Sequence, residues 1–126
     1  TVKATDNTGV TGMYTSSQGL KGDAVWGTRN DWVILSGVKD NAPISFCIFD
    51  NPKNPGYPAY AHARGYGLFA LNNLGQNSYD PKQEKKSLTI EQGQSITLYH
   101  RFYVQSGSEL TSANANKIFQ EFSKAY

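Results

Sequence analysis

The chain has 126 residues, of which 38% are hydrophobic, 17% charged and 13% aromatic, and its formal net charge is +2. That length fits one domain able to bury its own core, and the aromatic content favours β structure, so we expect a β-rich globular domain. The lysines are scattered and form no basic stripe, and no apolar run approaches the roughly 18–20 residues that span a bilayer, so nucleic acid and a membrane are not predicted as partners.

The stretch from Asp31 to Asp50 predicts a β-hairpin. Two apolar runs, DWVILSGV and PISFCIFD, are separated by the turn-forming residues KDNA. Both alternating sets of the second run are apolar, so this strand should be central in a sheet that is covered on both sides. Cys47, the single cysteine of the chain, is therefore predicted to be a small buried hydrophobe rather than a reactive thiol.

Three of the five prolines lie between Asp50 and Pro58, which forbids a helix and excludes an interior strand there. We expect an ordered loop from Asn51 to about Tyr60 and a return to strand in GYGLFALN. Between them, AYAHARGYG has no aliphatic side chain larger than alanine but contains one of two histidines and one of three arginines. This composition indicates a contact surface.

The stretch KSLTIEQGQSITLYHRFYVQSG predicts a short strand, a turn at Glu-Gln-Gly-Gln and a long strand from Ser95 to Val104. His100 falls in the apolar face of the long strand, where a polar group needs a partner. The side chains on the opposite face, which is either solvated or lines a cleft, are Thr97, Tyr99, Arg101 and Tyr103.

The apolar pattern changes to a helical period from about Thr111 onward. Thr111 or Ser112 can cap the helix. The apolar side chains on one face of this helix are Ala115, Ile118, Phe119, Phe122 and Tyr126. The predicted fold class is thus mostly β: an antiparallel β-sandwich over residues 1–126 with one C-terminal amphipathic helix packed on the sheet.

Aromatic residues and arginines mark a candidate binding surface. Trp32 starts a strand and is expected in the core, whereas Trp26 lies in a glycine-rich loop close to Arg29. An aromatic ring can stack on the apolar face of a sugar, and a guanidinium can bind carboxylate oxygens as a planar fork. The predicted substrate-binding residues are Trp26, Arg29, Tyr60, Arg64 and Tyr66.

The histidines leave several interpretations open. His62 is either a hydrogen-bonded loop histidine or a general base. His62 and His100 could also converge with Asp50 or Asp23 on one cation, but no close-spaced ligand pair supports a metal site. The sequence contains no phosphate-binding glycine loop, no Gly-x-Ser-x-Gly elbow and no cysteine pair for zinc, so no cofactor is predicted.

Three stretches carry a family resemblance: GDAVWGTRNDWV, FDNPKNPGYPAYAHARGYGLFALNNLGQ and GQSITLYHRFYV. They resemble the C-terminal part of a bacterial family labelled PmoA-like or "methane oxygenase". Asn51 and Ala61 stand where the family pattern has histidine and tryptophan, which leaves Asp50, His62 and Arg64 as the matching polar positions. Through this resemblance Asp50 joins His62 as a catalytic candidate.

The resemblance implies a β-sandwich of unknown function from bacteria that handle complex carbohydrates, secreted or periplasmic. Family members are longer, so it also implies that this chain is the C-terminal part of a longer protein. The domain would then contact a missing N-terminal part and could be half of a larger supersandwich.

Functions of different classes therefore remain open. In a carbohydrate-active domain the aromatic side chains stack on a sugar or sugar acid, the arginines bind its oxygens and His62 transfers a proton. A non-catalytic glycan-binding or accessory module would use the same surface without a titrating group. A purely structural role is the third interpretation. A recessed His62 beside a carboxylate or His100 favours catalysis, and an exposed aromatic face favours binding.

Overall fold

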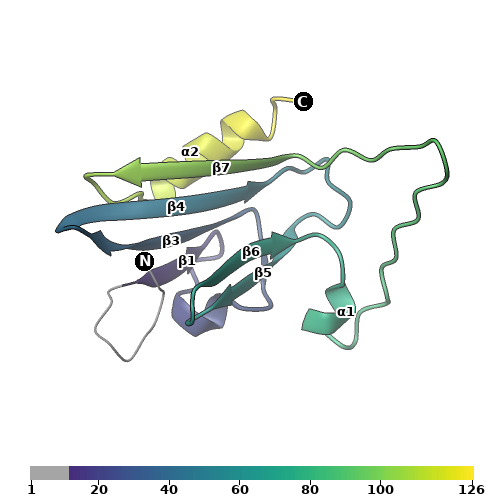
Figure 1. Ribbon diagram of the computed structural model, residues 1–126, viewed down its shortest axis with the longest axis horizontal. Helices are drawn as coiled ribbons and strands as arrows, with labels where there is room; N and C mark the ends of the chain where they lie inside the picture. Colours follow the sequence, from purple (N-terminus) through teal and green to yellow (C-terminus); the bar gives the residue numbers. More distant parts are fainter. Residues whose placement is uncertain (1–11) are drawn as a thin grey trace.

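Two antiparallel sheets and a C-terminal helix form the layers of the computed structural model, which describes residues 12–126 (Figure 1). One sheet has four strands in the order β1-β3-β4-β7, and the other has three in the order β2-β5-β6. The strands are β1 (Met13–Ser16), β2 (Arg29–Asn30), β3 (Trp32–Lys39), β4 (Ala42–Asp50), β5 (Ala59–Arg64), β6 (Leu68–Asn72) and β7 (His100–Ser106). The helices are the 3-10 turn η1 (Gly22–Val25), the short α1 (Gln76–Tyr79) and α2 (Ser112–Phe122). The predicted sandwich with a C-terminal helix is confirmed.

The predicted hairpin is the centre of the four-stranded sheet. Strand β3 pairs with β4 over the whole length of β3, from Trp32 opposite Phe49 to Lys39 opposite Ala42. The turn between them places Asp40 and Asn41 at φ values of 52° and 61°, a left-handed conformation that Asp and Asn tolerate better than other side chains. Since β4 also pairs with β7, it is a central strand, as its two apolar faces indicate.

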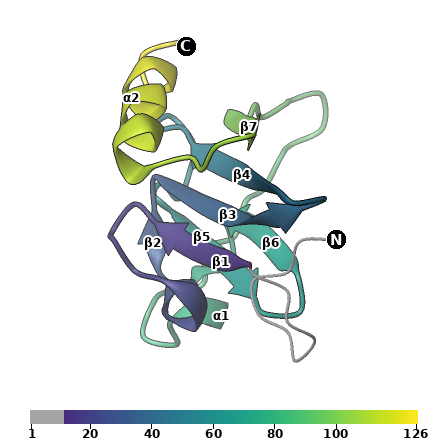
Figure 2. The same ribbon diagram turned by 90° about the vertical axis from the view of Figure 1, so that its left-hand side faces the viewer.

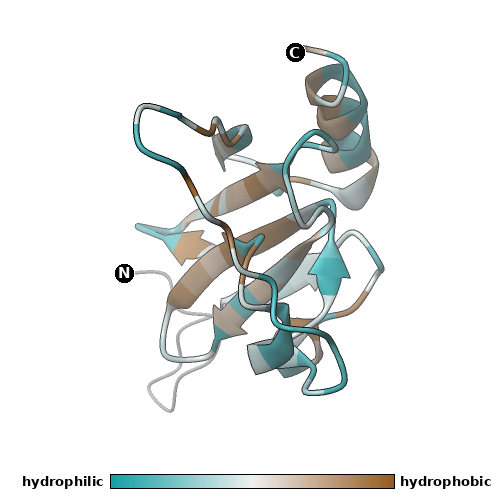
Figure 3. Ribbon diagram, turned by 90° about the vertical axis from the view of Figure 1, so that its right-hand side faces the viewer, coloured by the Kyte–Doolittle hydropathy of each residue, from teal (hydrophilic) through white to brown (hydrophobic). Residues whose placement is uncertain are grey.

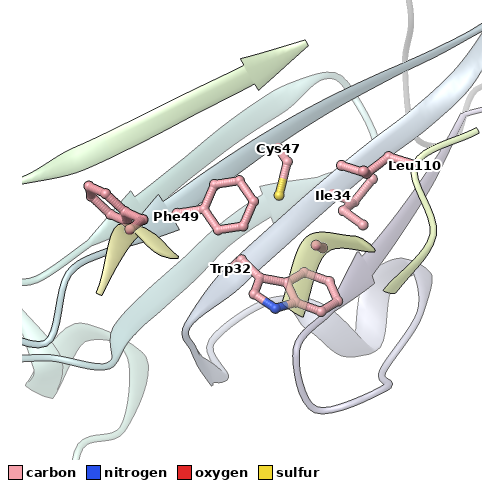
Figure 4. Packing of buried hydrophobic residues seen from close by; sticks show 7 residues of the cluster. Trp32, Ile34, Cys47, Phe49 and Leu110 are labelled. Carbon is pink, nitrogen blue, oxygen red and sulfur yellow. The ribbon is translucent and has the colours of Figure 1, made fainter. Parts of the chain in front are cut away.

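Apolar side chains fill both spaces between the layers. Between the sheets, Tyr14 and Val33 pack with the small residues Ala61 and Ala63. Figure 2 shows α2 on the other side of the four-stranded sheet. The buried cluster beneath this helix is shown in Figure 4 and comprises Trp32, Ile34, Cys47, Phe49, Leu110, Ala115 and Phe122. The structure thus confirms Trp32 as a core residue.

Cys47 is fully buried. Burial raises the pKa of its thiol, because the thiolate is poorly solvated among apolar side chains. The prediction of a small buried hydrophobe is confirmed.

Helix α2 begins where the sequence predicts. Thr111 is its N-cap, and the Thr111 hydroxyl oxygen accepts a hydrogen bond of 3.2 Å from the backbone N–H of Asn114. Arg101 lies over the ring of Phe122, at 4.9 Å from its centroid. The face of β7 that carries Arg101 and Tyr103 is therefore covered by this helix and does not line a cleft.

Replacement of Thr111 by Ala should lower the free energy of unfolding by about 1 kcal/mol, because the N–H of Asn114 loses its acceptor. Urea unfolding followed by circular dichroism measures the change. Ser112→Ala is the matched control, since Ser112 is the first helical residue and the cap is Thr111. An equal loss in both variants would show that the Thr111 cap does not set the helix start.

Of the two strands predicted after α1, the short one does not form and the long one is confirmed only in part. The segment 80–99, here called the arm, is extended without sheet pairing, although Gln94 N–H donates to the Glu91 carbonyl in the predicted turn. The long strand starts at His100 instead of Ser95. Its neighbour explains this difference: His100 pairs with Asp50, where β4 ends and residues 51–58, here called the proline loop, begin. Residues before His100 therefore have no strand to pair with.

A second difference is the strand β5. We expected the loop to continue to about Tyr60, but the chain is in a strand from Ala59 to Arg64. The inward positions of this strand hold three buried alanines at 59, 61 and 63. Alternation of small buried and larger outward residues allows a strand without bulky aliphatic side chains to pack closely on the core.

Part of the four-stranded sheet is not covered by the second sheet. On β7, Phe102 is 62% exposed and Val104 is 50% exposed, and Phe46 of β4 lies beside Phe102 with ring centroids 6.2 Å apart. We call this surface the open face; Figure 3 shows the apolar stretches of the sheet and the arm. The exposed apolar side chains of the arm are Leu88, Ile90, Ile96 and Leu98. Across residues 12–126, none of the helices has the length and apolar character needed to cross a membrane.

Candidate functional site

The outer side of β5 carries the side chains that the sequence singles out. Tyr60, His62 and Arg64 alternate with the three alanines, so they point away from the core. Exposure increases along the strand: Tyr60 is buried, His62 is half-buried and Arg64 is exposed. The strand therefore presents an imidazole and a guanidinium toward solvent above a buried aromatic ring.

Trp26, directly after η1, joins this group from a neighbouring segment. Backbone hydrogen bonds tie the segment to β5, since Gly27 N–H donates to the Ala61 carbonyl at 2.8 Å. The guanidinium carbon of Arg64 lies 4.1 Å from the centroid of the Trp26 ring. The His62 ring meets the same Trp26 ring edge-on, with 6.5 Å between the two centroids. Trp26, Arg64 and His62 are thus brought together as predicted residues of one surface.

A residue that the sequence analysis did not single out completes the group. Tyr79 of α1 stacks on Tyr60 with centroids 5.0 Å apart and an interplanar angle of 7°, and it meets His62 edge-on at 5.6 Å. Its hydroxyl accepts a hydrogen bond of 3.3 Å from the side chain of Asn72. We call Trp26, Tyr60, His62, Arg64 and Tyr79 the aromatic cluster. Tyr79 lies in a polar, turn-rich stretch, so no local pattern identifies it.

Arg29 has a different role from the predicted ligand contact. Its guanidinium donates to three backbone carbonyls of the proline loop, those of Gly56 (3.1 Å), Tyr57 (3.0 Å) and Pro58 (3.0 Å). It also lies over the ring of Tyr60, at 5.2 Å from the centroid. These donors hold the proline loop against β2 and β5, so Arg29 positions the edge of the cluster.

Tyr66 lies outside the cluster, in the turn between β5 and β6. It is 72% exposed, and the turn is closed by a hydrogen bond of 3.0 Å from Gly67 N–H to the Arg64 carbonyl. The hydroxyl of Tyr14 also donates to the Arg64 carbonyl, from within the core. The phenol ring of Tyr66 is therefore exposed to solvent, two residues after Arg64 in the sequence.

Asp50 contacts a set of polar side chains that does not include His62. It is fully buried at the end of β4, and its carboxylate accepts hydrogen bonds from Asn54 and Asn73. Nε2 of His100 lies 3.4 Å from Asp50 Oδ1. Among residues 12–126, no hydrogen bond or ion pair joins Asp50 to His62, so the histidine beside the buried carboxylate is His100.

The loops around Asp50 are packed tightly. A Cβ atom added to Gly56, whose φ is +78°, would lie 2.0 Å from the carbonyl oxygen of Asn73. Only glycine allows this close approach of the proline loop to the loop after β6. The amides of Asn54 and Asn73 are thereby fixed on the two sides of the carboxylate.

The part of the chain that the structure describes shows no group of three or more His, Cys, Asp or Glu side chains placed to hold a metal ion. His62 is surrounded by aromatic rings and His100 by Asp50 and Asn73. Asp23 lies exposed in η1. The weak candidates for a shared cation site are therefore placed in separate surroundings.

Comparison with known proteins gives one match. The model of a family described as "Family of unknown function (DUF6807)" matches residues 2–120. No curated protein and no solved structure matches the chain, and nothing in the family match refers to the PmoA-like label. Because the match covers nearly the whole sequence, the chain belongs to this family of unknown function.

Proposed function

We propose that this domain binds a sugar acid at the aromatic cluster, with Arg64 contacting the carboxylate. The observation that carries the proposal is the placement of Arg64: an exposed guanidinium held 4.1 Å above the Trp26 ring. A guanidinium held over an indole ring forms no hydrogen bond with that ring, so a carboxylate can still accept hydrogen bonds from two of its N–H groups. The ring orients Arg64 without consuming its hydrogen-bond donors.

Neighbouring groups support a ligand that combines a carboxylate with hydroxyl groups. The indole Nε1 of Trp26 is buried and has no hydrogen-bond partner among the described residues. A buried donor of this kind is rare without a partner, and a ligand oxygen could supply one. The exposed Tyr66 ring offers a stacking surface for the apolar face of a sugar, because one face of the Trp26 ring is already occupied by Arg64.

The surroundings of His62 favour binding over catalysis at this surface. The rings of Trp26 and Tyr79 lie edge-on to it, and no carboxylate among residues 12–126 forms a hydrogen bond or ion pair with it. A general base is normally oriented by a hydrogen bond to its second ring nitrogen. In the proposed function His62 therefore contributes a polar contact to the ligand rather than a proton transfer.

Titration of the protein with D-glucuronate and D-glucose, followed by isothermal calorimetry, tests this function. Glucuronate should bind at least about tenfold more tightly, and Arg64→Ala should remove that preference because the bidentate contact with the carboxylate is lost. Lys85→Ala is the matched control, since it removes the same charge from the exposed arm. Equal affinities for the two sugars, or an Arg64→Ala variant with unchanged preference, would contradict the proposal.

A structural function is the second candidate, and the open face favours it. Phe102 and Val104 remain exposed on β7, whereas sandwich strands normally bury such side chains against a facing sheet. In this alternative the open face contacts polypeptide that precedes Thr1 in a longer protein. A periplasmic or secreted location is part of this proposal and rests on the PmoA-like resemblance alone. Hydrogen exchange of β7 in a longer form of the protein tests it: unchanged protection of β7 amides would argue against such a contact.

A further inference from the structure

A buried carboxylate lies where the ends of three strands meet. Figure 1 shows β4 and β6 ending, and β7 starting, at the same side of the sandwich. Asp50 is the last residue of β4, and its partner in the β4–β7 register is His100, the first residue of β7. A fully buried carboxylate needs several hydrogen bonds to offset its lost hydration. The side chains that surround it therefore determine which proton chemistry is available at this end of the molecule.

The hydrogen bonds fix the orientation of both asparagine amides. Asn54 Nδ2 donates to Asp50 Oδ1 at 2.7 Å, and Asn54 Oδ1 accepts from the backbone N–H of Tyr99 at 2.7 Å. Asn73 Nδ2 donates to both oxygens of Asp50, at 3.0 and 2.9 Å. Because the donor side of Asn73 is directed at the carboxylate, its Oδ1 is the atom that faces His100.

This arrangement determines the tautomer of the His100 ring. Nε2 of His100 lies 2.9 Å from Asn73 Oδ1, and an amide oxygen can only accept a hydrogen bond. Nε2 must therefore carry the hydrogen, which leaves the lone pair of the neutral ring on Nδ1. Within residues 12–126 Nδ1 has no hydrogen-bond partner, and the His100 side chain is 32% exposed, so the lone pair is not used by another group of the described chain.

We propose that His100 is a pre-oriented proton acceptor for the hydroxyl group of a small molecule, with Asp50 and Asn73 as positioning residues. In this step the O–H bond of the ligand breaks, an N–H bond forms at Nδ1 and the ligand oxygen keeps the electron pair. The ring becomes an imidazolium that retains its Nε2–H bond to Asn73, and the charge lies beside the Asp50 carboxylate. Ion pairing with a nearby carboxylate stabilises that product.

This site is separate from the aromatic cluster and does not depend on sugar-acid binding. The two sites lie next to each other along the chain at Asn72 and Asn73: the first contacts Tyr79 and the second contacts Asp50 and His100. The neighbouring asparagines therefore supply a test variant and a control variant that differ by one position.

Nitrogen-15 NMR of histidine-labelled protein tests the tautomer directly, because the chain has only two histidines and His62→Gln assigns their signals. The neutral His100 ring should show a protonated Nε2 and an unprotonated Nδ1. Asn73→Ala should raise the share of the Nδ1–H tautomer, since it removes the nearer of the two acceptors at Nε2 and leaves only the Asp50 oxygen at 3.4 Å, whereas Asn72→Ala should leave the His100 signals unchanged.

Diethyl pyrocarbonate, which acylates the ring nitrogen that bears a lone pair, tests whether Nδ1 is available. In the wild-type protein the His100 adduct should form at Nδ1 in more than about tenfold excess over Nε2, a ratio that one hydrogen bond is strong enough to enforce. Asn73→Ala should reduce this excess, and Asn72→Ala should not. A Nδ1–H tautomer, an inert His100, an adduct at Nε2 or equal behaviour of the two asparagine variants would each overturn the proposal.

Discussion

Replacement of Trp32 by Ala should lower the free energy of unfolding by about 3–5 kcal/mol. Trp32 is 1% exposed in the cluster beneath α2, and its indole N–H donates to the side chain of Asn116 at 2.9 Å. The variant therefore loses apolar contacts, leaves a cavity between sheet and helix, and removes a hydrogen bond that holds α2 in place. Urea unfolding measured by far-ultraviolet circular dichroism gives the change.

Trp32→Phe separates the two contributions. This variant keeps most of the buried ring but loses the hydrogen bond to Asn116, so its loss should be smaller than that of Trp32→Ala by at least about 1 kcal/mol. Asn116→Ala removes the same hydrogen bond from the helix side. A loss below about 1 kcal/mol for Trp32→Ala would mean that α2 does not depend on this cluster for its attachment.

Replacement of Arg29 by Ala should destabilise the protein by about 2–3 kcal/mol and loosen the proline loop. Arg29 is the common donor to the carbonyls of three consecutive residues, 56–58. Without it these carbonyls depend on water, and the loop loses its attachment to β2. Denaturant unfolding measures the stability, and hydrogen exchange at Tyr57 N–H, which donates to the Asn54 carbonyl, reports on the loop.

Arg29→Lys tests whether the shape of the guanidinium matters. A lysine keeps the charge, but its single ammonium group cannot reproduce a planar fork that reaches three carbonyls. The lysine variant should therefore recover less than half of the stability lost in Arg29→Ala. Full recovery would indicate that charge alone holds the loop, and unchanged exchange at Tyr57 in either variant would contradict the clamp.

The hairpin and the helix were predictable because their signals are local. The apolar runs on both sides of KDNA specify β3 and β4, and the helical pattern of apolar residues after Thr111 specifies α2. Strand β5 was missed because alanine carries little strand preference, and its place depends on β2 and β6 on either side. The start of β7 was misplaced because strand pairing depends on where the neighbouring strand ends.

The candidate site was likewise predictable only where the sequence signal is local. Composition identified Trp26, His62 and Arg64, and the structure places them together. The partners of Asp50 could not be found from sequence spacing, since Asn73 directly follows β6 and His100 begins β7, whereas Asp50 ends β4. Arg29 illustrates the limit for a single residue: a guanidinium suited to a ligand carboxylate is equally suited to backbone carbonyls.

Along β5, buried alanines alternate with outward side chains, so the residues that pack the core differ from those that could contact a ligand. Its alanines at 59, 61 and 63 are buried in the molecule, while the side chains at 62 and 64 lie on the outside. Changes at these two outward positions leave the interior volume untouched, so they can alter what the surface binds without a large change in stability. Relatives could therefore diverge in ligand preference at these positions, and a library randomised there would sample new binding surfaces on an intact scaffold.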